Sequence, residues 1–341
     1  MKKNSSIAFV AGKSGGHLLP CITKAQQIIA QQPETKILFF TTKGTLDKTI
    51  VEKYPFLSNV VFLPIQPFPH KHFWRYPAFI WHLITSFFIS LYSLFQHKPT
   101  SVISMGGLIS MPVCLAGYIL KLPITLYELN VVPGKAIRAL APLATSLFIC
   151  FEKTQQYFKK KCILTHYPIR FSKHHKTISK EVACQKIGLQ SKLPTLLILG
   201  GSQGSLFLNN IIKSWTQTIN FKQPIQIIHQ IGNNDTSEWH TFYKTLNIPA
   251  LVFSFHHEIE HYYAAADIVL CRAGAGTLFE ILFFLKKTIV IPLETTKNNH
   301  QLSNALACAQ NYPTLITVVR QQEIRQNGML FDSVIHKKFT E

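Results

Sequence analysis

Short apolar runs alternate along this chain with stretches in which apolar side chains recur every three or four residues. In the first half, the runs at 7–11, 36–41, 60–63, 101–104 and 124–127 predict buried strands, and the stretches at 18–30, 78–95 and 111–120 predict helices. In the second half, the same criteria predict strands at 195–199, 225–229, 250–253, 268–271 and 288–291, and helices at 206–219, 261–265, 277–285 and 301–310. Because strands that alternate with helices indicate βαβ units, we expect an α/β protein with parallel sheets that uses one architecture twice.

A polar, basic stretch of weak periodicity at 171–193 separates the two halves. The 341 residues are enough for two domains that each bury a core. We therefore place a domain boundary near Pro168, with an N-terminal domain at 1–167 and a C-terminal domain at 168–341.

Positive charge dominates the composition, with 35 Lys and Arg against 16 Asp and Glu, and residues 1–167 hold 18 of the basic and 5 of the acidic side chains. Such a field attracts the phosphates of nucleic acid, anionic lipid or a diphosphate ligand. The basic residues lack a nucleic-acid reading motif, so a nucleic-acid partner is the least favoured. Seven cysteines without a C-x-x-C pair fit a reducing cytoplasm better than a disulfide or zinc framework.

The most apolar stretch, residues 78–95, carries no formal charge and lies at the lower edge of the length that spans a bilayer. A polar stripe follows one side of the predicted helix, formed by His82, Ser86, Ser90, Ser93 and His97. Arg75 and Lys98 flank the stretch and Phe73 and Trp74 precede it, which suits a helix lying on a membrane surface. A core helix of the N-terminal domain fits equally well, and a transmembrane helix is the third interpretation.

Each half opens with an apolar strand, a glycine-rich turn and a helix, and the turns are 12–17 (GKSGGH) and 200–205 (GGSQGS). Glycine lets the backbone approach a ligand, and the N-terminus of a helix presents free N–H groups to an anion. Neither turn is the G-x-G-x-x-G of dinucleotide-binding domains, and a P-loop would need glycine where Ile7 stands. Because ligands bind at the carboxyl ends of parallel strands, two such domains suit two phosphorylated substrates.

Seven segments between about residues 7 and 310 resemble, in order, the motifs of the MurG family of peptidoglycan glycosyltransferases. They are 12–17 (GKSGGH), 105–112 (MGGLISMP), 127–130 (YELN), 200–205 (GGSQGS), 229–232 (HQIG), 271–280 (CRAGAGTLFE) and 299–305 (NHQLSNA). The resemblance implies two Rossmann-like domains whose parallel sheets face across a cleft, the GT-B fold. It also implies an N-terminal domain for the acceptor and the membrane, and a C-terminal domain for the UDP-sugar donor, with the last residues expected to pack back on the N-terminal domain.

The resemblance implies transfer of N-acetylglucosamine, with inversion, from UDP-N-acetylglucosamine to the C4 hydroxyl of the muramyl sugar of lipid I, an undecaprenyl-diphosphate-linked acceptor. The product is lipid II of peptidoglycan synthesis. The enzyme would need no cofactor or metal and would lie peripherally on the anionic cytoplasmic face of the inner membrane. The alternatives are a catalytically impaired UDP-sugar- or lipid-binding homologue, a transferase with another polyprenyl-diphosphate acceptor, and a UDP-sugar epimerase.

An inverting transfer needs a base at the acceptor hydroxyl and stabilisation of the departing diphosphate. His17 stands at the start of the first helix, where the helix dipole keeps its imidazole neutral and able to act as that base. Glu128, at the end of a predicted strand, would act as a base or orient His17, although an ion pair with Lys135 is an equally open role. Asn130 would bind a sugar or the diphosphate, or serve only as a turn residue.

The resemblance assigns substrate binding to a larger set of positions: Ser14, Gly15, Gly16, Asn130, Arg170, Ser202, Gln203, Asn209, Phe255, His256, Ala275, Gly276, Thr277, Leu278, Phe279, Glu280, His300 and Gln301. Ser202 and the neighbouring amides would hold the diphosphate, with added charge from Arg170. Glu280 would accept from the ribose hydroxyls.

In the same assignment, Phe255 and the backbone of His256 would line the uracil pocket, and Gln301 with His300 would contact the sugar hydroxyls. The chain departs from the family pattern mainly on the acceptor side. Tyr127 and Leu129 replace the His and Gln of the family's H-E-Q-N segment. These changes bear on the acceptor more than on the donor.

Overall fold

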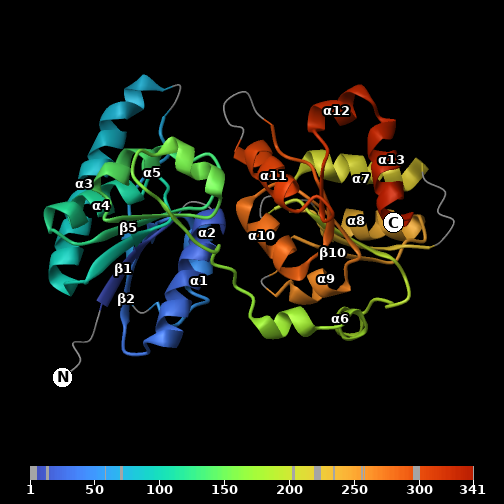
Figure 1. The fold of residues 1–341 in the computed structure, drawn as a ribbon, viewed down its shortest axis with the longest axis horizontal. Coiled ribbons are helices and arrows are strands. Elements are labelled where there is room, and N and C mark those ends of the chain that lie inside the picture. Colours follow the sequence, from blue (N-terminus) through green and yellow to red (C-terminus); the bar gives the residue numbers. More distant parts are fainter. Residues whose placement is uncertain are drawn as a thin grey trace. The chain divides into compact units, whose positions relative to one another are not determined.

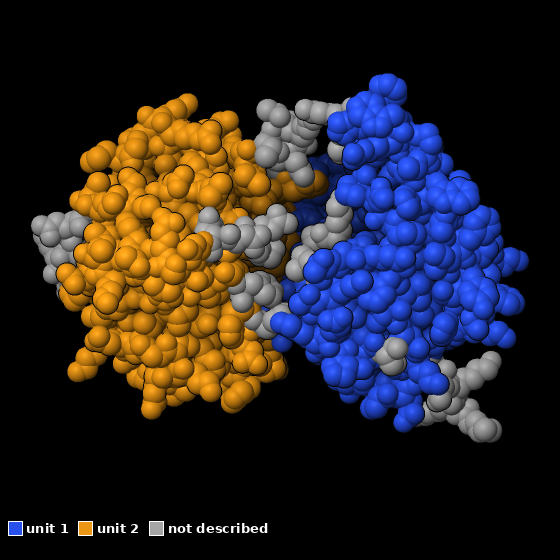
Figure 2. Space-filling view, turned by 180° about the vertical axis from the view of Figure 1, so that it is seen from behind, with its two compact units in different colours: residues 1–170 blue, residues 171–341 orange. Residues whose placement is uncertain are grey.

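The computed structural model describes residues 6–12, 15–57, 59–69, 72–201, 204–218, 224–232, 235–254, 256, 258–294 and 300–340. The chain divides into two compact units, residues 1–170 (unit 1) and 171–341 (unit 2), which are coloured separately in Figure 2. Each unit is built around one parallel sheet, as the alternating sequence pattern predicts (Figure 1).

Unit 1 contains a seven-stranded sheet in the order β3-β2-β1-β4-β5-β6-β7. Its strands are β1 (Ser6–Val10), β2 (Lys36–Thr42), β3 (Asn59–Leu63), β4 (Ser101–Ser104), β5 (Ile124–Glu128), β6 (Ser146–Ile149) and β7 (Ile163–Leu164). Its helices are α1 (Gly15–Gln31), α2 (Thr45–Val51), α3 (Tyr76–His97), α4 (Ser110–Ile119) and α5 (Lys135–Leu140), with 3₁₀ turns η1 (Phe73–Arg75), η2 (Ala141–Leu143) and η3 (Glu152–Tyr157). Helices α3, α4 and α5 lie on one side of the sheet, and α1 and α2 lie on the other (Figure 1).

Unit 2 contains a six-stranded parallel sheet in the order β10-β9-β8-β11-β12-β13. Its strands are β8 (Thr195–Leu199), β9 (Gln226–Gln230), β10 (Ala250–Phe253), β11 (Ile268–Cys271), β12 (Lys287–Val290) and β13 (Ile316–Val318). Its helices are α6 (Lys180–Ile187), α7 (Leu206–Thr218), α8 (Thr236–Thr245), α9 (Glu260–Ala265), α10 (Ala275–Phe284), α11 (His300–Asn311), α12 (Gln321–Gln326) and α13 (Met329–Thr340), preceded by the 3₁₀ turn η4 (Lys173–Thr177).

The central strands of both sheets are buried on two faces, which explains why β1, β8 and β11 are apolar runs. In unit 1, the central strand β1 pairs with β2 and β4, so that Phe9 lies beside Phe39 and Ile103. In unit 2, the last helix, α13, contributes Phe331 and Ile335 to the core of its own unit. The edge of the Phe331 ring contacts Trp215 of α7, which fixes α13 to this unit.

Helix α3 turns the serines of its polar stripe toward the protein and its large aromatic side chains outward, whereas His97 at its end is exposed. Ser86, Ser90 and Ser93 are buried, and α3 packs against α4 and β3. The hydroxyls of Ser86 and Ser90 each donate to the carbonyl four residues earlier, so the small polar side chains need no other partner. The exposed large apolar side chains of the outer surface are Phe73, Trp74, Tyr76, Ile80, Trp81, Ile84, Phe88, Tyr92 and Phe95.

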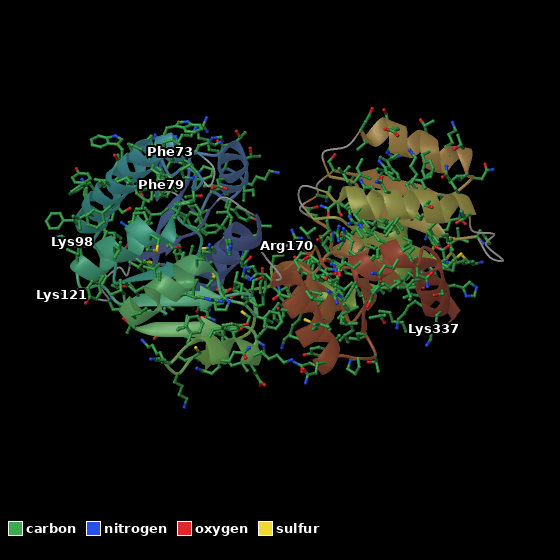
Figure 3. The ribbon with its side chains drawn as sticks, turned by 90° about the horizontal axis from the view of Figure 1, so that it is seen from above. Phe73, Phe79, Lys98, Lys121, Arg170 and Lys337 are labelled. Atoms are coloured by element: carbon green, nitrogen blue, oxygen red, sulfur yellow. The ribbon has the colours of Figure 1, made fainter. Side chains whose placement is uncertain are left out.

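By length and composition, Phe73–His97 is the one stretch among the described helices that could cross a membrane. Basic side chains lie at both ends of the exposed aromatic surface of α3. Arg75 lies exposed at its start, and Lys98 follows its end. Figure 3 shows Lys98 near Lys121, which follows α4, while Phe73 lies toward the opposite end of the helix. We call the exposed large apolar side chains between residues 73 and 95, together with the basic residues Arg75, Lys98 and Lys121, the aromatic face.

Candidate functional site

Each sheet has one point at which the chain reverses the direction in which it adds strands. In unit 1 this point lies between β1 and β4, and in unit 2 it lies between β8 and β11. Ligands of open parallel sheets bind at the carboxyl ends of the strands at such points. Both glycine-rich turns predicted from the sequence follow the first of these strands, so each unit has a candidate binding edge.

In unit 1, His17 lies in the first turn of α1, beside the loop that follows β4. Gly106 of that loop has a φ of 91°, and a Cβ atom at Gly106 would lie 3.1 Å from Cγ1 of Ile137 and 3.9 Å from Cε1 of His17. Only glycine adopts this backbone conformation without strain and leaves this room. The structure thus brings His17 and the Met-Gly-Gly segment together at the binding edge of unit 1.

Asp47 is a buried residue at this edge that the sequence analysis did not identify. Its Oδ2 accepts hydrogen bonds from Oγ1 of Thr41 at 3.0 Å and from the backbone N–H of Thr42 at 3.2 Å. A Cβ at Gly12 would lie only 2.9 Å from the same oxygen. Asp47 therefore packs directly against the start of the first glycine-rich turn and leaves no room for a side chain at Gly12.

Glu128 ends β5 and is 2% exposed. Its Oε1 accepts from the backbone N–H of Asn130 at 2.9 Å and from Nδ2 of Asn130 at 3.2 Å, and its Oε2 accepts from the N–H of Gly134 at 2.8 Å. Burial raises the pKa of Glu128, and these hydrogen bonds oppose the rise. Both carboxylate oxygens thus hold the loop 129–134, which fixes the position of Asn130.

The two residues that depart from the family pattern beside Glu128 are buried. Tyr127 stacks on Phe148 with ring centroids 4.9 Å apart, and Leu129 is 1% exposed. The ammonium of Lys24 lies 5.7 Å from the centroid of the Tyr127 ring. The substitutions therefore change packing around the strand end, while Glu128 and Asn130 keep their mutual contact.

In unit 2, the glycine-rich turn packs tightly on the loop after β9. Gly204 donates its N–H to the carbonyl of Gly201 at 2.9 Å, and its own φ is 75°. A Cβ at Gly204 would lie 2.5 Å from the carbonyl oxygen of Ile231, so glycine is required there. Ser14 of the first turn and Ser202, Gln203 and Phe255 of unit 2 lie outside the described residues.

Arg272 links this turn to the ends of three other elements, and the sequence analysis did not place it in the site. Its Nε donates to Oγ of Ser205 at 3.0 Å, and its Nη1 donates to the carbonyl of Ile291 and to Oε1 of Gln321, both at 3.1 Å. Its guanidinium also lies over the Phe207 ring, 5.3 Å from the centroid. Burial lowers the pKa of Arg272 to about 10, so the group stays charged at neutral pH and adds positive potential beneath the turn.

Helix α10 begins at the binding edge of unit 2 and carries six of the predicted substrate-binding residues, 275–280. Gly274 caps the helix in an extended conformation, so the N–H groups of Ala275, Gly276 and Thr277 form its first turn. Leu278 is buried in the core, and Phe279 is half-buried. These features make the start of α10 suited to bind an anion.

Glu280 is half-buried one turn further along α10. Its Oε2 accepts a hydrogen bond of 2.9 Å from the hydroxyl of Tyr263 in α9. Acidic side chains that stabilise a helix through its dipole lie in the first turn. Glu280 lies beyond the first turn of α10, so this role does not explain its position.

Gln301 lies in the first turn of α11, after His300, and joins two strand ends. Its Oε1 accepts from the N–H of Ala273 at 3.2 Å and from the N–H of Leu293 at 2.8 Å. Asn304, one turn later, donates to the carbonyl of Ala273 at 3.4 Å. The structure therefore brings Gln301 next to the start of α10, with its carboxamide oxygen committed to the backbone.

Three other predicted residues have contacts of a different kind. The ring of His256 is exposed and bonds through Nδ1 to the backbone of Glu258. Arg170 is the last residue of unit 1 and is labelled in Figure 3. Burial raises the pKa of the Tyr54 hydroxyl, and the positive charge of Arg170 opposes this rise. Asn209 is 2% exposed and supports the turn from within the core.

Asn209 belongs to a buried chain of hydrogen bonds beneath the glycine-rich turn. Its Nδ2 donates to the carbonyl of Ile231 at 3.3 Å, and its Oδ1 lies 3.3 Å from Nε2 of His229. Nδ1 of His229 lies 2.8 Å from the hydroxyl of Tyr243. Because a carboxamide oxygen only accepts, Nε2 of His229 carries the proton and Nδ1 accepts from Tyr243. This series of hydrogen bonds thus ends at the carbonyl oxygen of Ile231, against which Gly204 packs.

Acidification is expected to destabilise unit 2 through His229. Burial lowers the pKa of His229 from 6.5 to about 3, so below pH 6.5 the unfolded chain binds a proton that the folded chain rejects. Between pH 7.5 and pH 5, this residue alone should lower the free energy of unfolding by about 2 kcal/mol. Urea unfolding followed by fluorescence measures the loss, since Trp215 and Trp239 lie in the core of unit 2.

The His229→Gln variant should lack this component of the pH dependence. His240→Gln is the matched control, because His240 is an exposed histidine of the same unit, on α8. A pH dependence equal in the wild type and in His229→Gln would show that His229 does not carry the effect.

Comparison with protein families matches the glycosyltransferase family 28 N-terminal domain over residues 7–149 and the family 28 C-terminal domain over residues 195–329. Two curated relatives, from Thermodesulfovibrio yellowstonii and Caldanaerobacter subterraneus, are both named UDP-N-acetylglucosamine–N-acetylmuramyl-(pentapeptide) pyrophosphoryl-undecaprenol N-acetylglucosamine transferase. The first is 34% identical over 88% of this chain and 81% of its own length, and the second is 31% identical over 87% and 82%.

Solved structures share the fold. MurG of Acinetobacter baumannii matches with a TM-score of 0.73 at 22% identity, covering 97% of this chain and 91% of that one. The Anabaena protein HepE, solved in complex with UDP, matches with a TM-score of 0.56 at 12% identity, covering 92% of this chain and 91% of that one.

Proposed function

The chain belongs to glycosyltransferase family 28 and, within it, to the MurG family, and from this premise we propose that it converts lipid I to lipid II. It is a hexosyltransferase that moves N-acetylglucosamine from UDP-N-acetylglucosamine to lipid I, and the proposed acceptor atom is the C4 hydroxyl of the muramyl sugar. Its two α/β units, each with a parallel sheet, form the GT-B fold expected from the sequence. The observation that carries the proposal is a glycine-lined binding edge at the strand-reversal point of each family 28 domain.

Unit 2 is proposed to bind the donor. The diphosphate would accept from the backbone N–H groups of the turn 200–205 and of the first turn of α10, with Arg272 supplying positive potential from below. Glu280 would accept from the ribose hydroxyls. Gln301, whose oxygen is held by two backbone amides, would present its NH₂ group to the sugar. As charge develops on the departing UDP, these fixed donors lower the barrier without reorganising.

Unit 1 is proposed to bind the acceptor and to supply the base. His17, at the N-terminus of α1, would remove the proton of the C4 hydroxyl as that oxygen attacks the anomeric carbon from the face opposite UDP. The dipole of α1 favours the neutral imidazole that this step needs. Glu128 would act indirectly, by holding the loop that positions Asn130 at the acceptor. The reaction would use these two substrates and no cofactor.

The aromatic face of unit 1 is proposed to bind the enzyme to the anionic cytoplasmic surface of the inner membrane. Aromatic and aliphatic side chains enter the boundary between headgroups and acyl chains, and lysine and arginine beside them attract anionic lipid. The aromatic start of α3 follows β3 and therefore lies at the carboxyl edge of the sheet, the edge that also carries His17. A lipid-linked acceptor would thus reach His17 from the membrane surface.

A transfer assay tests the proposed function. Purified protein is incubated with UDP-N-acetylglucosamine and a lipid I analogue, and both UDP and the lipid-linked disaccharide are followed. Equal yields of UDP and of disaccharide, with an inverted anomeric centre, are expected. Nucleotide binding without either product would favour the impaired homologue, and conversion of the free UDP-sugar to an epimer would favour the epimerase.

A further inference from the structure

The hydroxyl of Tyr263 bonds to the carboxylate of Glu280, the residue that the proposed function assigns to the ribose hydroxyls. Tyr263 lies in α9 and is completely buried, whereas Glu280 lies in α10 and is half-buried. The hydroxyl donates to Oε2 of Glu280 at 2.9 Å. A buried hydroxyl therefore reaches a side chain at the surface of the binding edge.

Two phenylalanines fix the Tyr263 ring. The ring of Phe284 stacks on it with centroids 5.0 Å apart and planes 14° apart. Phe171 meets Tyr263 edge to face at 6.0 Å and also contacts Phe284 at 4.9 Å. Aromatic pairs at these separations hold preferred orientations, so the hydroxyl has one direction, toward α10.

A glutamate side chain has three rotatable bonds, and it must stop moving before it accepts from two adjacent hydroxyls. A hydrogen bond from a ring that is already fixed removes part of that freedom in the free protein, and this lowers the cost of binding. The Tyr263 bond restrains the position of Oε2 of Glu280 and so limits the orientations that the carboxylate adopts.

We propose that Tyr263 is a positioning residue for donor binding, which aligns Glu280 to accept from the ribose hydroxyls of a uridine diphosphate. The proposal rests on the proposed function, in which Glu280 contacts the ribose. Phe171, the first residue of unit 2, belongs to the same arrangement because it packs on the ring.

The test compares the binding of UDP and of 2′,3′-dideoxy-UDP to the full-length protein by calorimetry. Wild type is expected to prefer UDP by about tenfold or more, since a site built for hydroxyls loses affinity for an analogue that lacks them. Tyr263→Phe, which removes one oxygen and keeps the ring, should weaken UDP binding by about fivefold to twentyfold. It should leave dideoxy-UDP binding unchanged, so the preference nearly disappears.

Tyr243→Phe is the matched control. It removes a tyrosine hydroxyl that is equally buried in the same unit and hydrogen-bonded to His229, but that has no described contact with Glu280. It should lower the melting temperature without changing the ratio of the two affinities. Phe171→Leu provides a second variant that keeps the Tyr263 hydroxyl, and it should reduce the preference for UDP partially.

The outcomes separate the inference from the proposed function. If wild type prefers UDP and Tyr263→Phe keeps the full preference, Tyr263 is only a packing residue and the inference is overturned, while the proposed function stands. If wild type does not distinguish the two nucleotides, Glu280 does not contact the ribose and the inference fails with that assignment. The transfer assay then decides whether the activity itself remains.

Discussion

Replacing His17 with alanine is expected to slow sugar transfer by about 10²–10⁴-fold, the usual contribution of a positioned general base. UDP binding should stay at the wild-type level, because His17 lies in unit 1 and the proposed nucleotide contacts lie in unit 2. Steady-state rates with a lipid I analogue measure the first quantity, and calorimetry with UDP measures the second. Together they separate a loss of chemistry from a loss of donor affinity.

His166→Ala is the control for this experiment, since His166 is an exposed histidine of the same unit. It should transfer sugar at the wild-type rate. Unchanged turnover in His17→Ala would remove His17 from the mechanism. An equal fall in turnover and in UDP affinity would instead point to a general disturbance of the fold.

The paired substitutions Trp81→Glu and Phe88→Glu should reduce binding to vesicles that contain anionic lipid by at least about 10²-fold. The side chains of Trp81 and Phe88 are 67% and 60% exposed on the aromatic face, and burying each in the membrane boundary is worth about 2 kcal/mol. The introduced carboxylates would also be repelled by the anionic surface. Vesicle sedimentation measures the binding, and stability should change little because both side chains already face water.

Leu306→Glu serves as the control, because it places the same carboxylate on an exposed apolar position of unit 2. Vesicle binding of Leu306→Glu should be that of the wild type, apart from the small effect of one charge. If the double variant bound vesicles as well as the wild type does, this result would contradict the proposed membrane binding by the aromatic face.

The apolar pattern predicted the strands that form the centre of each sheet, because these strands are buried on both faces and their sequences are continuously apolar. It missed short elements whose burial depends on neighbours far along the chain. Helix α8 was not predicted, since few of its side chains are apolar and only Trp239 and Tyr243 are buried. Strand β13 was missed because it has three residues and is recognisable only by its pairing with β12.

The orientation of α3 was not accessible from the sequence. A polar stripe on an apolar helix is usually the side that faces water. Here Ser86, Ser90 and Ser93 face the protein, because their small size suits close packing on α4, and the hydroxyls of Ser86 and Ser90 bond within the helix. The sequence therefore identified the stripe and its basic and aromatic flanks, and the structure showed which side is exposed.

The sequence motifs fall at the candidate binding edges, but sequence reasoning did not identify the residues that pack beneath them. The glycine-rich turns and the start of α10 lie where strand-reversal points place them. Asp47, Arg272 and Tyr263 were missed as supporting residues, because each acts on a partner that only the fold brings near. The sequence offered two signs of such residues: Asp47 is the one aspartate in residues 1–167, and Arg272 directly follows a predicted buried strand.

A crystal structure with UDP-N-acetylglucosamine bound tests the proposed donor site of unit 2 most directly. We predict that the diphosphate oxygens lie within hydrogen-bonding distance of the main-chain N–H groups around Gly204 and at the start of α10, with the ribose against Glu280. A nucleotide seated away from both elements would contradict the assignment of unit 2 as the donor-binding domain.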